Sequence, residues 1–188
     1  MPSGCERSSS LLNTVCKCVV FSGHYPPFPG VPRKQIRHSG SDTVRAVIQR
    51  VTAAQVTVSE TVVAKTGPGL CVLLAVHKDD REGNADFLGD KIANLRIFED
   101  AQGKMNLSVR DSGGELLIVS QFTLYGDCRK GNRPFYSEAA PAPQAEILYD
   151  RFVQRLRLTG LRVATGRFQA RMAVSLVNDG PVTILLEG

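Results

Sequence analysis

The sequence predicts a single α/β domain in which two main helices are layered on a mixed sheet. Three observations lead to this prediction. Short segments rich in β-branched and apolar residues recur through most of the chain, as strands do. Two longer segments place apolar residues at helical spacing, with charged residues between them. Strands and helices do not alternate strictly, and neither Gly-x-Gly-x-x-Gly nor a phosphate-loop motif occurs, so we do not expect a doubly wound nucleotide-binding fold.

The first part of the fold is expected to consist of strands. The opening segment is rich in β-branched residues, and Ser59-Glu60 separates two further segments as the turn of a hairpin. A turn at Gly67-Pro68-Gly69 precedes an apolar run that is typical of a strand covered on both faces. In order, these predicted strands are Val44–Val51, Gln55–Val58, Thr61–Lys65 and Leu70–Val76.

Two segments predict amphipathic helices. Glu82–Leu95 has apolar residues at helical spacing, although Gly89 inside it disfavours a helix. The second helix follows the long irregular connection Tyr125–Pro143 and ends near Gly160. The apolar positions that mark it are Ala145, Leu148, Tyr149, Phe152 and Leu156.

Further strands are predicted between and after the helices. Asn178–Thr183 alone would be interpreted as a tight turn between the last two of them. The predicted strands are Arg96–Glu99, Lys104–Leu107, Glu115–Leu124, Arg162–Thr165, Met172–Val177 and Val182–Leu186.

The composition is that of a globular protein. The chain has 188 residues, of which 43% are hydrophobic, enough for one domain with a substantial core. No apolar run reaches the ~18 residues of a membrane-spanning helix, so we expect no membrane partner. The formal net charge of +5 is compatible with a polyanion such as RNA, although many enzymes of small metabolites share it. Residues 1–43, with five basic and two acidic residues, contribute +3 of this charge.

Residues 1–43 are predicted to be a disordered extension ahead of a folded domain at 44–188. The extension shows no sustained helix or strand period. Two other interpretations stay open: an organellar transit peptide, or translation that begins at Val44, which would require a GTG codon there. Cys5, Cys16 and Cys18 with His24 lack the spacing of a common zinc site, so unpaired thiols in a reducing compartment are favoured.

The side chains of residues 44–188 include few of the groups that conventional hydrolases use for catalysis. His77 is the only histidine there, and its place after an apolar strand predicts a surface position rather than a catalytic one. Nucleophilic triads require an oriented histidine. No paired-histidine motif with metal spacing is present, so we expect neither a metal nor a cofactor.

Two segments carry a resemblance to a known family. Ser120–Leu124 reads Ser-Gln-Phe-Thr-Leu and, taken alone, would be a strand end, while Asn178–Thr183 reads Asn-Asp-Gly-Pro-Val-Thr. Together with four shorter segments they closely resemble the D-aminoacyl-tRNA deacylases, from Val44 to about Glu187. The shorter segments are Gln49-Arg50-Val51, Arg96-Ile97-Phe98, Lys104–Leu107 and Thr165–Phe168.

The resemblance implies a three-layer β/β/α sandwich, a homodimer and a chirality proofreading enzyme of translation. Such an enzyme hydrolyses the ester of D-aminoacyl-tRNA, and of glycyl groups mischarged on alanine tRNA. In the family, Gly180-Pro181 of one subunit enters the active site of the other with its peptide bond in cis. Its carbonyl oxygens would accept hydrogen bonds from the α-amino group, while the backbone leaves no room for an L side chain.

The resemblance also implies roles for individual residues. Ser120, Gln121, Phe122 and Thr123 would line the reacting ester, with an oxyanion hole made by backbone N–H groups near the last two. A Thr123 nucleophile lacks an evident base, so attack of water assisted by the 2′-hydroxyl of the terminal adenosine is preferred. Arg50 is expected to brace the partner's Gly180-Pro181, with a surface salt bridge as the alternative. Asn178 and Thr183 are expected to support the same motif.

The remaining expectations concern tRNA. Phe168 and Met172 resemble the part of the family's site that receives the terminal adenine. The alternative is that Phe168 is an ordinary core residue. Lys130 and Arg133 are expected to contact tRNA phosphates. The alternative is that they are ordinary solvated charges. We expect no DNA partner and a cytoplasmic location, or an organelle if residues 1–43 are a transit peptide. The competing functions are a non-catalytic tRNA-binding module and a related deacylase that removes L-alanine from threonine tRNA, whose Gly-Pro bond is trans.

Overall fold

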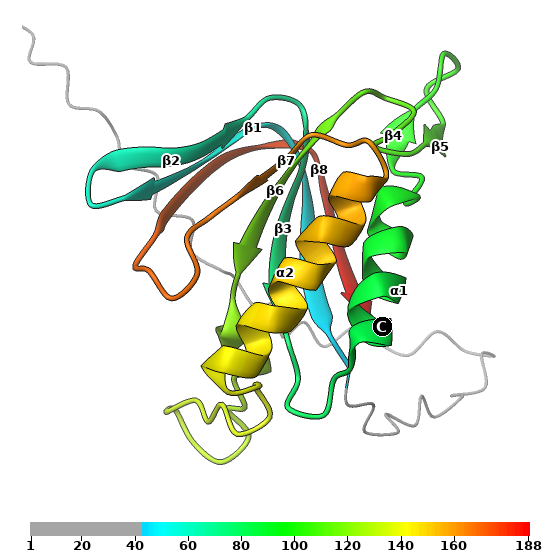
Figure 1. The fold of residues 1–188 in the computed structure, drawn as a ribbon. Coiled ribbons are helices and arrows are strands. Elements are labelled where there is room, and N and C mark those ends of the chain that lie inside the picture. Colours follow the sequence, from blue (N-terminus) through cyan, green and yellow to red (C-terminus); the bar gives the residue numbers. More distant parts are fainter. Residues whose placement is uncertain (1–42) are drawn as a thin grey trace, which may run out of the picture. The chain divides into compact units, whose positions relative to one another are not determined.

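The computed structural model describes residues 43–188, which form eight strands, two α-helices and one 3-10 helix in the part described (Figure 1). The predicted extension at 1–43 therefore lies, apart from Thr43, outside the described residues. In chain order the elements are β1 Arg45–Val58, β2 Thr61–Thr66, β3 Gly69–Ala75, α1 Glu82–Ala93, β4 Phe98–Glu99, β5 Met105–Leu107, β6 Glu115–Ser120, η1 Phe122–Tyr125, α2 Ala142–Leu158, β7 Val163–Thr165 and β8 Ala173–Glu187.

The long strand β1 organises the sheet. Its first half pairs antiparallel with β3, its second half pairs antiparallel with β2, and β8 pairs with it along nearly its whole length. The predicted hairpin is confirmed: Ser59 and Glu60, between β1 and β2, have φ values of 47° and 65°, as a two-residue hairpin turn requires. Since β3, β6 and β7 are parallel to one another, the sheet is mixed, as predicted.

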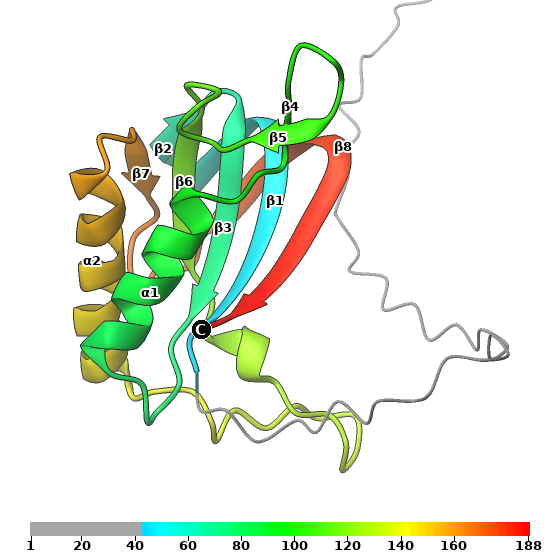
Figure 2. The same cartoon turned by 90° about the vertical axis from the view of Figure 1, so that its right-hand side faces the viewer.

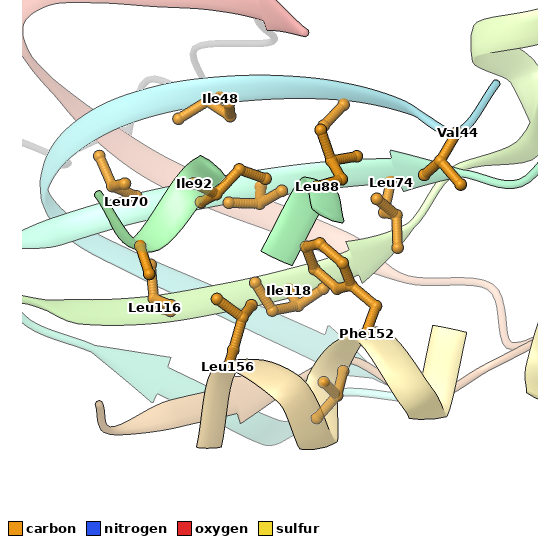
Figure 3. Close-up of a cluster of buried hydrophobic side chains, with 14 of the residues drawn as sticks. Val44, Ile48, Leu70, Leu74, Leu88, Ile92, Leu116, Ile118, Phe152 and Leu156 are labelled. Atoms are coloured by element: carbon orange, nitrogen blue, oxygen red, sulfur yellow. The ribbon is translucent and has the colours of Figure 1, made fainter. Parts of the chain in front are cut away.

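Two hydrophobic clusters separate three layers. The larger cluster lies between the sheet and the two helices, which cover the same face of it (Figure 2). Its largest members include Phe152 and Leu156 of α2, which meet Leu116 and Ile118 of β6 (Figure 3). The second cluster joins residues of β1 and β2 to residues of β3 and β6, because the sheet folds back on itself. The predicted three-layer β/β/α arrangement is confirmed.

The helices α1 and α2 approach closely at Gly89. A Cβ atom there would lie 3.2 Å from Cγ of Arg155, which explains why a glycine stands in a helix interior. On either side of this contact, Arg151 binds Asp86 at 2.6 Å and Arg155 binds Asp90 at 2.7 Å. The hydrogen bonds from these arginines lower the pKa of both aspartates.

Two predictions about strand ends are wrong. The strand expected to run to Leu124 ends at Ser120, and the chain then turns into η1. The two strands and tight turn expected at the C-terminus are one strand, β8, because β1 is long enough to pair with both halves. Between the pairs Gln49–Thr183 and Val51–Asn178, four residues of β8 face the single residue Arg50. Asn178–Thr183 is therefore a bulge in a continuous strand.

Candidate active site

A cavity of about 770 Å³ opens beyond the C-terminal end of β6. It brings together two groups of predicted site residues that lie far apart in the sequence: Ser120, Gln121 and Phe122 on one wall, and Phe168 and Met172 on another. The other residues that line it are Val119, Ala140, Ala142, Ala145, Gln169, Ala170 and Val174.

Parallel pairing with β3 fixes the first wall. The ladder ends at Leu74 and Ser120, and the backbone N–H of Gln121 donates to the carbonyl of Leu74 at 2.7 Å. The chain then enters η1, whose first N–H groups have no acceptor within the helix and can donate to a ligand. The Gln121 side-chain amide donates to the Thr123 hydroxyl, which is exposed and does not line the cavity.

Phe168 serves the core and the cavity together. It packs against the larger hydrophobic cluster, with its ring centroid 5.8 Å from that of Tyr149, and it also lines the cavity. The Tyr149 hydroxyl donates to the carbonyl of Ile118 at 3.0 Å, and burial raises the pKa of this hydroxyl. Sδ of Met172 would lie 2.6 Å from a Cβ at position 166, so this glycine lets the methionine reach the cavity.

The irregular connection after η1 forms a basic hairpin beside the cavity. Asp127 and Phe135 exchange backbone hydrogen bonds of 2.8 and 3.0 Å, which close the loop at 128–134. Lys130 and Arg133, the predicted phosphate contacts, are exposed on this loop and do not line the cavity. Arg129 binds Asp127 and lowers the pKa of that carboxyl to about 2.

His77 is buried, so its predicted surface position is wrong. It is 3% exposed, with Nε2 3.2 Å from Oε2 of Glu138 and its ring 5.4 Å from that of Tyr125. The irregular connection, which includes Glu138, covers it, and hydrogen bonds from Lys78 and His77 lower the pKa of the Glu138 carboxyl. His77 does not line the cavity, and its contacts instead hold the connection against the end of β3.

Arg50 braces the Gly180-Pro181 segment of its own chain. Its side chain is 6% exposed, its Nη1 donates to the carbonyl of Ile97 at 2.6 Å, and its Nε lies 3.1 Å from Oδ2 of Asp179. The sequence predicts that Arg50 braces the partner's segment, with a surface salt bridge as the alternative. Within one chain it contacts the bulge of β8, because β1 and β8 are neighbours.

The Gly180-Pro181 peptide bond is cis, and both residues are exposed. The two other predicted members of the motif lie at the two ends of the bulge. Asn178 pairs with Val51, and the Thr183 hydroxyl donates to Oε1 of Gln49.

Within one chain, the cavity and the Gly180-Pro181 segment lie apart. Arg50, which contacts the segment, pairs with Leu70 of β3, whereas Ser120 pairs with Leu74 of the same strand. Four residues of extended strand correspond to roughly 13 Å. Neither Gly180 nor Pro181 lines the cavity. The described residues of one chain therefore do not bring Gly180-Pro181 to the cavity.

Other classes of site find little support in residues 43–188. Over this range, no three His, Cys, Asp or Glu side chains are grouped so that they could hold a metal ion. No helix in the described part is long and apolar enough to cross a membrane. Ile97 and Tyr149 lie in segments that the sequence marks, but neither has a predicted role at the site, because their contacts with Arg50 and with the carbonyl of Ile118 join distant segments.

The chain is similar to known proteins over the same range. The model of the D-Tyr-tRNA(Tyr) deacylase family matches residues 47–187. The D-aminoacyl-tRNA deacylase of Symbiobacterium thermophilum is 59% identical over 144 residues, which are 77% of this chain and 95% of that protein. That of Thermotoga petrophila is 58% identical over 144 residues, with 77% and 97% covered.

Two solved structures are similar in fold. The c-Myc DNA Unwinding Element Binding Protein has a TM-score of 0.73 at 45% identity, with 77% of this chain and 98% of that chain covered. A probable eukaryotic D-amino acid tRNA deacylase has a TM-score of 0.70 at 19% identity, covering 77% and 99%. The second supports the fold alone.

Proposed function

The chain belongs to the D-Tyr-tRNA(Tyr) deacylase family, and from this premise we propose that it hydrolyses the ester bond of D-aminoacyl-tRNA to free tRNA and a D-amino acid. The observation that carries the proposal is the cavity in which Ser120, Gln121 and Phe122 meet Phe168 and Met172. This cavity has the size of a small-molecule site and an aromatic wall for a base. The proposed place of action is the cytoplasm, where translation is proofread.

The proposed enzyme is a homodimer in which each subunit completes the other's cavity. Gly180 and Pro181 are exposed and lie away from the cavity of their own chain. In the described residues β8 pairs with β1 alone, so its outer edge can meet a second copy. Val177 and Leu185 on this strand are 59% and 76% exposed, which fits an interface that buries apolar surface.

We propose that the backbone of the Gly180-Pro181 segment distinguishes D- from L-aminoacyl groups. Carbonyl oxygens of the partner's Gly180 and Pro181 accept hydrogen bonds from the substrate's α-amino group, and the same backbone occupies the space that an L side chain would need. A D side chain points away from it, so many D-amino acids, and glycine, are accepted. Arg50 supports this function by holding Asp179 and hence the bulge in place.

Attack by water is proposed to be assisted by the 2′-hydroxyl of the terminal adenosine. The N–H groups of Phe122 and Thr123 stabilise the oxyanion, at on the order of 3 kcal/mol per donor. The Thr123 hydroxyl accepts a hydrogen bond from the Gln121 amide, which is not a base, so nothing in this contact activates it as a nucleophile.

Release of D- and L-aminoacyl groups from one tRNA tests the function. We expect the D-aminoacyl ester to be hydrolysed at least about 100-fold faster, since an L side chain would overlap backbone atoms. Single-turnover assays with D-tyrosyl-, L-tyrosyl- and glycyl-tRNA measure this ratio. Equal rates for the two enantiomers would reject backbone-based selection. Faster release of L-alanine from threonine tRNA would identify the related deacylase, and tight binding without release would identify a binding module.

A substrate that ends in 2′-deoxyadenosine tests the mechanism. Loss of an assisting group ordinarily costs about 100-fold or more, so we expect a decrease of that size in the single-turnover rate. Thr123→Ala, assayed on the ordinary substrate, should retain the rate to within severalfold. Undiminished turnover of the deoxy substrate would exclude assistance by the 2′-hydroxyl. Inactivity of Thr123→Ala would instead favour Thr123 as the nucleophile.

A further inference from the structure

An exposed pair of aromatic side chains lies at the rim of the cavity. Phe122 is 55% exposed and Tyr136 is 38% exposed, and their ring centroids are 5.2 Å apart in an edge-to-face arrangement at 71°. We call these two residues the aromatic pair. Phe122 also lines the cavity, so the pair continues from the cavity wall onto the surface. Phe135, next in sequence to Tyr136, is 57% exposed, and apolar surface of this extent is typical of a binding region.

The backbone beneath Tyr136 fixes its position. A Cβ atom at Gly126 would lie 3.2 Å from Cε1 of the tyrosine and 3.5 Å from Cβ of Pro134, so the ring rests on the bare backbone of the glycine. The exchange of hydrogen bonds between Asp127 and Phe135 closes the hairpin beside this contact. Because the ring is held before a ligand arrives, little ordering entropy is lost when something stacks on it.

Positive charge adjoins the aromatic pair. The loop closed by this hairpin carries Arg129, Lys130 and Arg133, all exposed. Arg129 is occupied by Asp127 at 2.7 Å. Among the residues that the structure describes, neither Lys130 nor Arg133 is paired with an acidic side chain. An exposed aromatic surface beside unpaired cations is the combination that binds single-stranded nucleic acid, rather than an apolar peptide.

We propose that the aromatic pair binds the single-stranded nucleotides that precede the terminal adenosine of the tRNA substrate. This inference rests on the proposed function, which places that adenosine in the cavity. The preceding base stacks on Tyr136, and the phosphates of this segment meet Lys130 and Arg133. Since the pair is continuous with the cavity through Phe122, a strand whose last base enters the cavity passes over it.

Removal of the Tyr136 ring tests the stacking. We expect Tyr136→Ala to raise KM about tenfold or more for D-aminoacyl-tRNA and for a D-aminoacyl-CCA trinucleotide, since a stacked base contributes ~1–3 kcal/mol. The same variant should act on D-aminoacyl-adenosine, which lacks the preceding nucleotides, to within about twofold of the unmodified protein. Tyr136→Phe keeps the ring and should behave as the unmodified protein on all three substrates.

Loss of activity on D-aminoacyl-adenosine equal to that on the trinucleotide would overturn the inference, because the ring would then act only by supporting the cavity. Unchanged KM for the trinucleotide would overturn it as well. If the protein hydrolyses no D-aminoacyl ester, the proposed function fails instead. Binding of the unacylated CCA trinucleotide, followed by fluorescence titration, then decides the inference alone: Tyr136→Ala must bind it at least about tenfold more weakly than Tyr136→Phe.

The cations are tested by their dependence on salt. Lys130→Ala and Arg133→Ala should each lower the slope of log affinity for the trinucleotide against log salt concentration by about 0.7, the value per phosphate contact in single strands. Lys91→Ala, which removes an exposed cation on α1, serves as the control and should leave the slope unchanged. Slopes for Lys130→Ala and Arg133→Ala equal to that of the control would remove the phosphate contacts from the proposal.

Discussion

Replacement of Gly180 by alanine is expected to lower kcat/KM for D-aminoacyl-tRNA by about 100-fold, the cost of misplacing a positioning group by about 1 Å. Gly180 has φ +116°, a conformation that L side chains rarely adopt. Its new Cβ would lie 3.0 Å from Nη2 of Arg50 and 3.2 Å from the backbone nitrogen of Val182. Because Arg50 is itself held by Ile97 and Asp179, the bulge must shift rather than the arginine.

The loss should fall on the partner's reaction rather than on folding. The strained backbone is expected to cost about 1–3 kcal/mol of stability, which leaves the protein folded at 25 °C. Gly103→Ala is the matched control, since Gly103 also has a positive φ of 72° but has open space around its Cβ position. Steady-state kinetics with D-tyrosyl-tRNA, alongside thermal unfolding, separate the two effects. If Gly180→Ala and Gly103→Ala were equally active, the bulge would have no role in the substrate site.

The elements that could be predicted from the sequence are those whose buried face is evident from the residue pattern of the segment itself. Alternation and β-branching located β2 and both parts of β1, which is one strand rather than the two predicted at Val44–Val51 and Gln55–Val58. Helical spacing located α1 and α2. Each of these patterns records which face of its own segment is covered. The C-terminal bulge was predicted as a turn for the opposite reason. Whether Gly180-Pro181 ends a strand or bulges from it depends on β1, which lies more than a hundred residues away in the chain.

The site was accessible from the sequence only through resemblance. Nothing in the spacing of Ser120 and Phe168 indicates that they line one cavity, since parallel pairing of β3 with β6 and the path of the chain after β7 bring them together. His77 shows the same limit: its burial depends on Glu138 and Tyr125, which reach it across the irregular connection. The residues next to a polar side chain at a strand end do not indicate whether a distant segment will bury it.

Gly69→Ala is expected to have the largest effect on stability, with the free energy of unfolding lowered by about 3–5 kcal/mol. Gly69 has φ +153°, and a Cβ there would lie 1.9 Å from the carbonyl oxygen of Glu115 and 2.5 Å from its backbone nitrogen. These are backbone atoms of β6, which the parallel ladder from Gly69–Glu115 to Leu74–Ser120 holds in place. Neither strand can give way without breaking that ladder.

Thermal and denaturant unfolding of Gly69→Ala and Gly67→Ala measure this cost. Gly67 lies two residues earlier, has open space around its Cβ position, and should change stability by less than about 1 kcal/mol when substituted. A domain of this size should lose roughly 10 °C in Tm for a loss of 4 kcal/mol. Equal Tm values for the two variants would mean that β3 and β6 can separate at this end. In that case the ladder between β3 and β6 would not hold Ser120 firmly at the cavity. The proposed chemistry depends on a rigid cavity wall, and this part of the proposal would then be wrong.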